Sequence, residues 1–521
     1  MEVIGAGSEG QIEETQRDRQ LSRYRRFIPG RVFFALYSLA LAASISIWFI
    51  AIRAPLWLDE TGSYWQISGG FSKILSRQLI SFPAYSYILW LSTKIIGSSE
   101  IALRVPSILA MLGAVYLLYL AARELFERDV AFIAVIVFCL HPIVIFESID
   151  IRPYAFAALA TNAAILILLR LRRSDSNWLA ALLGLSAACI LWFHFLFAVI
   201  LPGLVLWFFV IKIRDRKTLW RQFGIAAAAF ALAALPAIPE LAYLFRTSKI
   251  HVYELAPNLL DLARILAPGW LLPIICVTVP VTLLVSSFTT RRRDSVIPLK
   301  RWHLPLCASL ALIPVLILFG VSVGTSIHLF KASHELVAVP GIALCWAFIA
   351  GRIESRSLRL LYCALFLAST AFHSFGASPI FGWASLTSKH ALEFVQKNAS
   401  ADNAPVLICS NYTESNYADM PLDTAKDSNY FTQLSYYRLS VPVVPLPLAL
   451  NDEAMRVGSR FLQEAATKHE RFLALAYLPS YRTLDWLAQS AAATHTVRKL
   501  GVFDGFEVLE FVPRTEAVAS R

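Results

Sequence analysis

The sequence has little charge for its length. Only 16% of its 521 residues are Asp, Glu, Lys or Arg, while 57% are hydrophobic. A soluble domain usually carries about a quarter charged residues. Several apolar runs reach the ~20 residues that a helix needs to cross a bilayer. The composition therefore indicates a polytopic α-helical membrane protein and argues against an ordinary soluble enzyme.

Several chemical signatures are also missing. The sequence contains no Gly-rich phosphate-binding loop, Walker motif or nucleophile elbow, so nothing supports ATP hydrolysis or acyl transfer. Cysteine is scarce, with seven residues, and only Cys409 lies in the polar C-terminal region. A disulfide framework is therefore excluded there. The net charge of +11 is typical of cytoplasmic loops in a membrane protein, and we expect no nucleic-acid partner.

The apolar runs predict about eleven membrane spans. Basic residues cluster in alternate connections, which places all the dense clusters on one side of the membrane. The N-terminal segment 1–31 is therefore expected to be cytoplasmic, and the tail from 378 to 521 to be extracytoplasmic. The predicted spans are 32–52, 101–122, 130–147, 154–171, 177–192, 195–212, 222–245, 265–289, 303–325, 333–351 and 357–376.

The two long outer segments differ in character. The first outer loop, 53–100, is aromatic and weakly amphipathic, which suits helices lying in the membrane interface. The tail alternates β-branched apolar runs with amphipathic patterns and predicts a small soluble α/β domain. The transmembrane domain would then be 32–377. In the tail we expect strands at 405–410, 471–478 and 505–512, and helices at 386–398, 455–469 and 483–492.

Two adjacent carboxylates, Asp59 and Glu60, follow the first span in "PLWLDETGSY". One interpretation is a solvated loop entry at the level of the lipid headgroups. The other is a functional site, because ionisable groups at the membrane rim often mark one. Trp57, Tyr64 and Trp65 could shield the carboxylates and raise a carboxyl pKa toward that of a general base.

A second polar group lies in "FESIDIRPYAF", between two predicted spans. Glu147, Asp150 and Arg152 fall in this short outer loop, and Pro153 suits the start of the next helix. These residues could form a salt-bridged helix corner. Alternatively, Arg152 could face the same site as Asp59, where its guanidinium would suit a phosphate.

Other outer-side cations have the same ambiguity. Arg104, at the start of the second span, could extend to the interface or neutralise an anion. Several cations converging beside carboxylates would indicate a lipid-phosphate substrate. The histidines toward this side match no zinc pattern, and we expect structural roles for them. The remaining outer cations are Lys94, Arg246, Lys249, Arg264 and Lys331; the histidines are 141, 194, 251, 328 and 334.

The order of these motifs resembles a known family. "PLWLDETGSYW", the segment with "ALRVPS" and "HPIVIFESIDIRPYAFAAL" resemble the bacterial dolichyl-phosphate-mannose protein mannosyltransferase-like membrane glycosyltransferases, whose relatives include the lipid A aminoarabinose transferases. The resemblance covers mainly residues 30–175. It implies the C-type glycosyltransferase fold and transfer of a sugar from a polyprenyl-phosphate carrier to an acceptor on the outer face.

The resemblance also implies site residues. Asp59 matches the aspartate held to be the catalytic base, and Glu60 matches its partner, thought to position the acceptor. Asp150 matches an acidic position before the Arg-Pro-Tyr motif. An active-site role for Arg152 and Tyr154, in that motif, is our inference.

Two segments depart from the pattern of the resembled family. Ser81 to Ala84 replace a His-Pro-Pro segment. His334 and Glu335 replace a late Arg-Tyr, which makes Lys331 the substitute phosphate ligand there.

We therefore predict an inverting glycosyltransferase of the inner membrane. Asp59 would accept the proton of the acceptor hydroxyl, with Glu60 and Asp150 beside it. Arg152, with Arg104 or Lys331, would hold the donor phosphate, and Tyr154 and Tyr64 would contact substrate. The acceptor would be a lipid, a polysaccharide or a protein. No nucleotide or ATP is required at this step, and a divalent cation is a possible cofactor, because carboxylates and water could hold Mg²⁺ or Mn²⁺.

Two alternatives remain from other classes of protein. A transporter or flippase for lipid-linked glycans would need charges deep within its spans and inverted repeats. A non-catalytic membrane protein could keep the fold and bind envelope glycans through its soluble tail.

Overall fold

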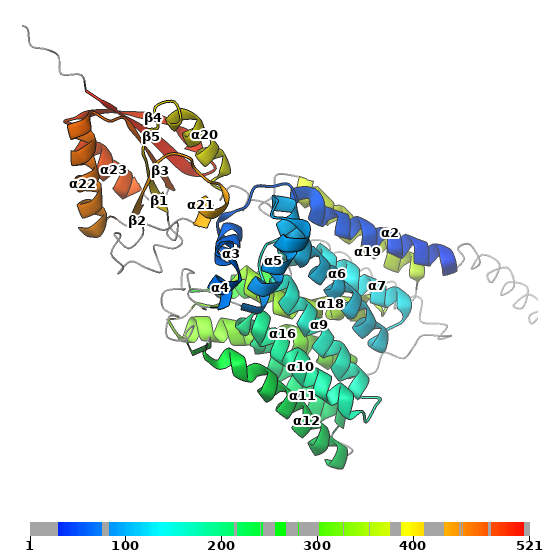
Figure 1. Ribbon diagram of the computed structural model, residues 1–521. Helices are drawn as coiled ribbons and strands as arrows, with labels where there is room; N and C mark the ends of the chain where they lie inside the picture. The colour runs from blue at the N-terminus through cyan, green and yellow to red at the C-terminus, as the bar shows by residue number, and fades with distance from the viewer. Residues whose placement is uncertain are drawn as a thin grey trace, which may run out of the picture.

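The computed structural model combines a bundle of membrane-length helices with a separate α/β domain at one end (Figure 1). The predicted cytoplasmic segment 1–31 and the predicted span 265–289 lie almost entirely outside the described residues, as do Ser81 and Phe82. The structure describes residues 30–75, 83–212, 216–239, 241–242, 256–266, 280, 302–326, 328–353, 355–375, 387–410, 432–447, 450, 452–477 and 481–514.

Seven helical stretches of the described residues are long and apolar enough to cross a membrane. The chain is thus a multi-pass membrane protein. The bundle consists of α2 (Gly30–Ser46), α6 (Glu100–Leu125), α7 (Arg128–Leu140), α9 (Tyr154–Leu171), α10 (Asn177–Phe193), α11 (Leu201–Lys212), α12 (Arg216–Ala234), α16 (His303–Gly324), α18 (Val339–Ala350) and α19 (Arg356–Phe375). Shorter pieces continue these helices, namely η1 (Ile47–Ala51), α8 (Pro142–Glu147), η2 (Phe195–Ile200), η3 (Leu235–Ala237), α17 (Ala332–Glu335) and η5 (Leu336–Ala338).

Helix α7 is enclosed by other helices of the bundle. Every residue from Val130 to Leu140 is buried, and α2, α6, α18 and α19 pack around it. Close helix packing depends on small residues. At Gly341 of α18, an added Cβ would lie 2.3 Å from the backbone nitrogen of Ala311 in α16, so these two helices meet backbone to backbone.

Local sequence explains where two predicted spans are interrupted. The expected span 130–147 is not one helix: α7 ends at Leu140, and α8 begins at Pro142. Proline suits the first turn of a helix and restricts the residue before it to an extended conformation. In the apolar block 177–212, His194 is extended (φ −158°) between α10 and η2, which confirms the predicted break at Phe193–His194.

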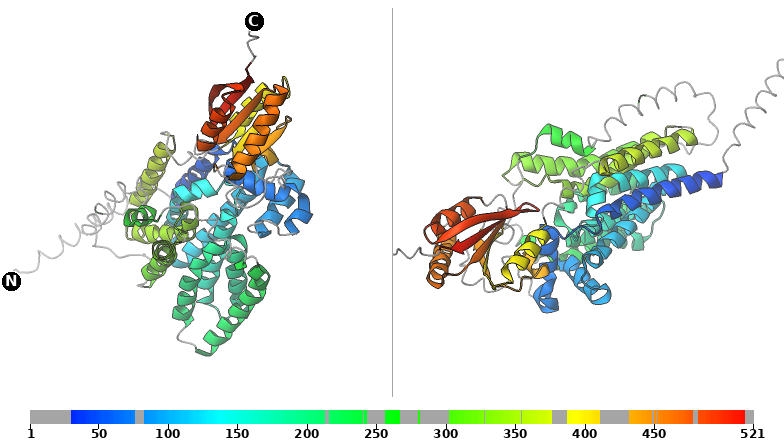
Figure 2. Two further views of the ribbon diagram at one scale, coloured as in Figure 1. Left: turned by 90° about the vertical axis from the view of Figure 1, so that its left-hand side faces the viewer. Right: turned by 90° about the horizontal axis from the view of Figure 1, so that it is seen from above.

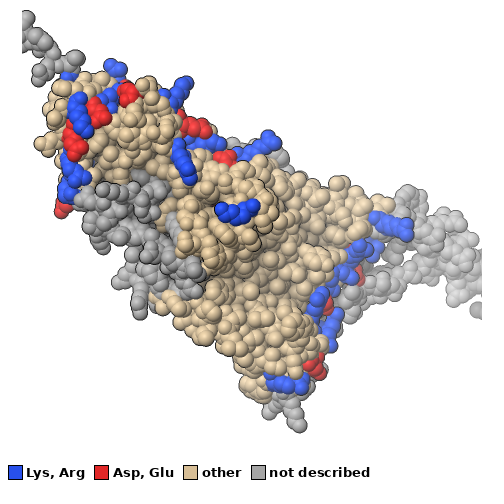
Figure 3. All heavy atoms as spheres, viewed as in Figure 1, with Lys and Arg blue, Asp and Glu red and all other residues tan. Residues whose placement is uncertain are grey.

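Lys and Arg gather at the end of the bundle away from the α/β domain, while the bundle surface between is mostly uncharged (Figure 3). We call this end the distal end, and the end beside the α/β domain the proximal end. Figure 2 shows the domain at the proximal end in both views. The segment between α2 and α6 lies at the proximal end and forms α3 (Leu58–Ser68), α4 (Gly70–Leu75) and α5 (Pro83–Ile96). Elsewhere in the chain, α14 (Leu259–Leu266) is a short amphipathic helix.

The C-terminal domain has a five-stranded sheet of order β2-β1-β3-β5-β4. Strand β1 runs parallel to β2 and β3, while β5 is antiparallel to β3 and β4. The predicted α/β domain is confirmed, including three strands and three helices, whereas β2, β4 and α21 were not predicted. The elements are α20 (Lys389–Ala399), β1 (Val406–Ser410), α21 (Thr432–Tyr436), β2 (Val443–Pro447), α22 (Asp452–Lys468), β3 (Phe472–Tyr477), α23 (Tyr481–Ala491), β4 (His495–Phe503) and β5 (Phe506–Pro513).

Candidate active site

Asp59 and Glu60 lie in the first turn of α3, at the proximal end. Glu60 reaches back to the start of its own helix, where Glu60 Oε2 accepts a hydrogen bond from Trp57 N at 3.3 Å. A glutamate at this position satisfies an amide that the helix itself leaves unpaired. Since the two carboxylates are consecutive, this bond points Glu60 inward. It leaves Asp59, with 16% of its side chain exposed, at the edge of the site.

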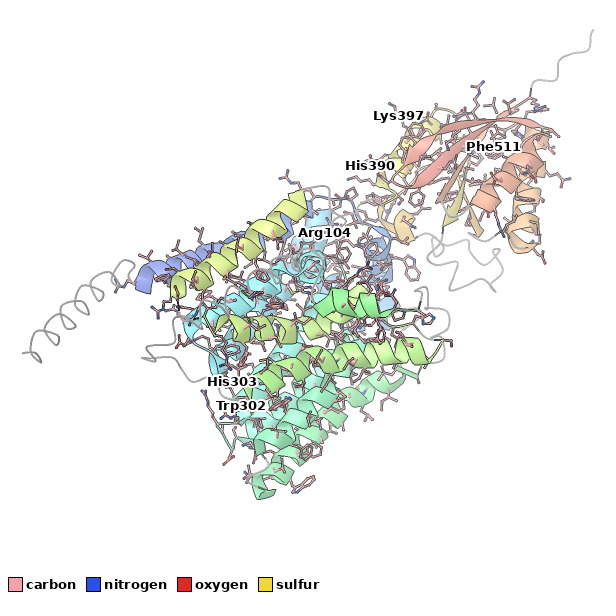
Figure 4. The ribbon with its side chains drawn as sticks, turned by 180° about the vertical axis from the view of Figure 1, so that it is seen from behind. Arg104, Trp302, His303, His390, Lys397 and Phe511 are labelled. Atoms are coloured by element: carbon pink, nitrogen blue, oxygen red, sulfur yellow. The ribbon has the colours of Figure 1, made fainter. Side chains whose placement is uncertain are left out.

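Arg104 of α6 is the partner of Glu60. Both side chains are fully buried, and Arg104 Nη2 lies 2.7 Å from Glu60 Oε2, with Nε 3.1 Å from Oε1. Arg104 Nη1 also donates to the carbonyls of Ile52 and Ala54, at 2.8 and 2.7 Å. Figure 4 shows Arg104 inside the bundle near the C-terminal domain. Arg104 thus binds two parts of the site: the backbone between α2 and α3, and the Glu60 carboxylate.

The hydrogen bonds to Glu60 indicate its protonation state. Burial raises the pKa of the Glu60 carboxyl, and the Arg104 guanidinium opposes that rise. Four N–H groups point at its two oxygens: two from Arg104, one from Trp57 and one from Ile151. A carboxylate has room for about four such donors only when it carries no proton. We conclude that Glu60 is ionised and that both of its oxygens accept hydrogen bonds.

Asp59 has a different partner. Arg152, from the turn between α8 and α9, places Nη1 3.3 Å from Asp59 Oδ2, and both side chains are partly exposed, at 18% and 16%. The predicted closeness of these two residues is therefore confirmed. A carboxylate and a guanidinium side by side, within reach of solvent, can accept a proton and bind an anion at neighbouring positions.

Asp150 is connected to the pair through Trp57. The Trp57 indole Nε1 donates to Asp150 Oδ1 at 3.0 Å, and only 2% of Asp150 is exposed. Burial raises the pKa of Asp150 to about 6, although Arg152 acts against this rise. Trp57 caps α3 with its backbone and contacts Asp150 with its ring, so it links the two halves of the site.

Aromatic rings and a lysine border the site. The guanidinium carbon of Arg152 lies 5.7 Å over the ring of Tyr154, and Tyr154 stacks on His194 at 4.7 Å between ring centroids. Lys331 is exposed just before α17, and the ring of His334 in α17 lies 6.4 Å from the Tyr154 ring. The structure thus brings the predicted cations Arg152 and Lys331 to one region.

Tyr64 contacts the C-terminal domain. Its ring meets Tyr436 of the C-terminal domain edge to face, 5.0 Å between centroids. Tyr436 and its neighbour Tyr437 were missed by sequence reasoning, because nothing in the polar tail signals which segment meets the membrane domain.

The described part of the chain contains no group of three or more His, Cys, Asp and Glu side chains arranged to hold a metal ion. A role for Mg²⁺ or Mn²⁺ stays a prediction.

Comparison with known proteins agrees with this architecture. Residues 82–243 match the family model described as dolichyl-phosphate-mannose-protein mannosyltransferase. The fold is similar to ArnT from Cupriavidus metallidurans bound to undecaprenyl phosphate (12% identity, TM-score 0.57) and to the same protein in the apo state (13% identity, TM-score 0.57); each match covers 91% of this chain and 97% of ArnT. A search of curated proteins gives no match.

The chain is thus a polytopic membrane protein with the C-type glycosyltransferase fold. The family model over residues 82–243 and the ArnT-like fold both agree with the resemblance predicted from the sequence.

Proposed function

We propose that the protein moves a sugar from a polyprenyl-phosphate carrier to an acceptor hydroxyl on the outer face of the inner membrane. The observation that carries this proposal is the pair of Asp59 and Arg152, 3.3 Å apart and both partly exposed. A base and an anion-binding cation are the two groups that the reaction needs. The similar fold of ArnT, crystallised with undecaprenyl phosphate, supports a carrier of this kind.

The reaction is a single displacement. Asp59 takes the proton of the acceptor hydroxyl while the hydroxyl oxygen attacks the anomeric carbon. The bond from that carbon to the phosphate oxygen breaks, and its electron pair leaves with the polyprenyl phosphate. Attack opposite the leaving group inverts the anomeric centre. No nucleotide is consumed at this step, because the phosphate is already a good leaving group.

The ion pair also gives an order to binding. An incoming phosphate competes with Asp59 for the Arg152 guanidinium, because both are anions that suit its N–H groups. Once Arg152 turns to the phosphate, Asp59 is released to accept a proton. Lys331, exposed on the same side, would add a second positive charge to the leaving group.

The other predicted residues would support this chemistry. Glu60 and Arg104 satisfy one another and hold the start of α3, so we assign them a positioning role. Asp150 would fix Trp57 against the site through the 3.0 Å hydrogen bond from the indole. Tyr154, under the Arg152 guanidinium, would orient that side chain.

Charge distribution supports the orientation. Basic side chains of the distal end include Arg123, Arg172, Arg173, Arg352 and Arg356. By the positive-inside rule, this end would face the cytoplasm. The N-terminus would then be cytoplasmic, and the active site and the C-terminal domain would be extracytoplasmic.

The test is transfer of a radiolabelled sugar from a polyprenyl-phosphate donor by the purified protein in proteoliposomes, with envelope lipids, polysaccharide and proteins as acceptors. We expect label in one acceptor class and release of unlabelled carrier phosphate. A vesicle flipping assay on the same preparation covers the transport alternative. Flipping without transfer would overturn the proposal in favour of a flippase. Binding of envelope glycans with neither activity would overturn it in favour of a non-catalytic protein.

A further inference from the structure

The C-terminal domain holds the membrane domain at the segment that leads into α3. Tyr437 directly follows α21, which packs against α3. Its hydroxyl oxygen accepts a hydrogen bond from Leu56 N at 2.6 Å and donates to Glu100 Oε1 at 2.8 Å. Lys389, at the start of α20, places Nζ 3.1 Å from the same Glu100 oxygen. We call Tyr437, Lys389 and Glu100 the latch.

Two more contacts flank the latch. Trp57 pairs with Thr387 in an isolated antiparallel backbone bridge. The Tyr436 hydroxyl donates to the carbonyl of Ser98 at 3.0 Å, and its ring meets Tyr64 of α3. The domain therefore touches the chain before α3, the helix itself and the start of α6.

These contacts lie very close to the reacting groups. Leu56 and Trp57 immediately precede α3, and Asp59 is the second residue of that helix. Arg104 fixes the preceding carbonyls from inside the bundle, while Tyr437 fixes the Leu56 amide from the domain side. A displacement of about 1 Å at a reacting group can cost about 100-fold in rate. Loss of either anchor would allow such a movement of Asp59.

The chemistry of the latch suits a lasting contact. Burial raises the pKa of the Tyr437 phenol, and its hydrogen bond to Glu100 adds to that rise. Tyr437 therefore keeps its proton and can donate to Glu100 while accepting from Leu56. Lys389 supplies the counter-charge of Glu100, with 29% and 19% of their side chains exposed.

We propose that Tyr437, Lys389 and Glu100 are positioning residues for the transfer reaction. Through them the C-terminal domain holds the Asp59 helix in its working position, without any domain residue touching the reacting atoms. This inference rests on the proposed role of Asp59. It makes the domain a working part of the active site rather than an independent appendage.

The first test is Tyr437→Phe, which removes the hydroxyl and keeps the ring. Loss of a partly buried hydrogen-bonding group of this kind corresponds to about a tenfold effect. We expect kcat to fall about tenfold, with KM for the donor within about twofold of wild type. The matched control is Asp504→Asn, which removes the negative charge from the 2.6 Å contact with His390 in the same domain and should leave kcat unchanged.

Hydrogen–deuterium exchange gives a readout that does not depend on activity. In Tyr437→Phe we expect the amides of Ala54 and of residues 56–60 to exchange about tenfold faster, while the strands of the domain keep their protection. Unchanged exchange there together with wild-type kcat would overturn the proposal. If the wild-type protein transfers no sugar, the proposed function fails, and the exchange experiment still tests the latch alone.

A charge swap provides the rescue. Lys389→Glu and Glu100→Lys should each lower kcat, because each places like charges side by side. The double variant restores an opposite pair, so it should recover activity relative to either single variant. Such coupling is the signature of direct interaction. Purely additive losses in the double variant would contradict the latch.

Discussion

Ion pairs lie at both ends of the bundle, in opposite surroundings. At the distal end, Arg173 and Glu124 are 2.7 Å apart, with 64% and 20% of their side chains exposed. At the proximal end, Arg104 and Glu60 are also 2.7 Å apart, but neither is exposed at all. Exposed pairs contribute little to stability, whereas buried pairs must offset a large desolvation cost. The proximal pair is thus best explained by the geometry that it imposes on Asp59.

Breaking the buried pair should have the largest effect on stability. Arg104→Met leaves the Glu60 carboxylate buried without its counter-ion, which costs roughly 3–5 kcal/mol. We expect a strong drop in melting temperature and loss of transfer. Thermal unfolding in detergent measures the first effect.

The double variant Arg104→Met with Glu60→Leu sharpens this test, because removing both partners avoids the unpaired charge. We expect it to regain stability but not transfer. A wild-type melting curve for Arg104→Met alone would show that the pair does not hold this end of the bundle.

The buried Asp150 should make the proximal end sensitive to pH. Burial raises the pKa of Asp150 to about 6, above its value in an unfolded chain, so folding favours the protonated form. Its contribution to stability is present below about pH 4 and is lost as the pH rises through 6. Asp150→Asn does not titrate, so relative to wild type its melting temperature should rise between pH 4 and 7. Parallel pH profiles for the two proteins would contradict this.

The distal pair should matter least. Arg173→Gln removes the exposed partner of Glu124, and we expect less than about 0.5 kcal/mol change in stability and unchanged transfer. Thermal unfolding and the transfer assay check both points. A loss comparable to that of Arg104→Met would remove the distinction between the two ends.

Elements with a strong local signal were predictable from the sequence. The break at His194 and strands such as β5 follow from length, periodicity and flanking residues. The span 130–147 was not predicted correctly, because its apolar composition hides the interruption at Pro142. Apolar composition alone cannot distinguish one continuous helix from two shorter helices.

The sequence predicted that Asp59 and Arg152 lie near each other, but it did not predict the partner of Arg104. Asp59 and Arg152 lie 3.3 Å apart, and the sequence had predicted both residues at the outer rim of the membrane domain. From the sequence, Arg104 could either extend to the lipid interface or neutralise an anion. The sequence could not reveal that the anion is Glu60, 44 residues away, because partners across a fold depend on how helices pack. The contacts of the latch could not be predicted for the same reason.

The most direct test of the central claim is the single-turnover rate of sugar transfer by Asp59→Asn, measured beside wild type with saturating donor. The account predicts a fall of about 10²–10⁴-fold, the usual contribution of a general base, with donor binding and melting temperature close to wild type. Transfer by Asp59→Asn at the wild-type rate would contradict the assignment of Asp59 as the base.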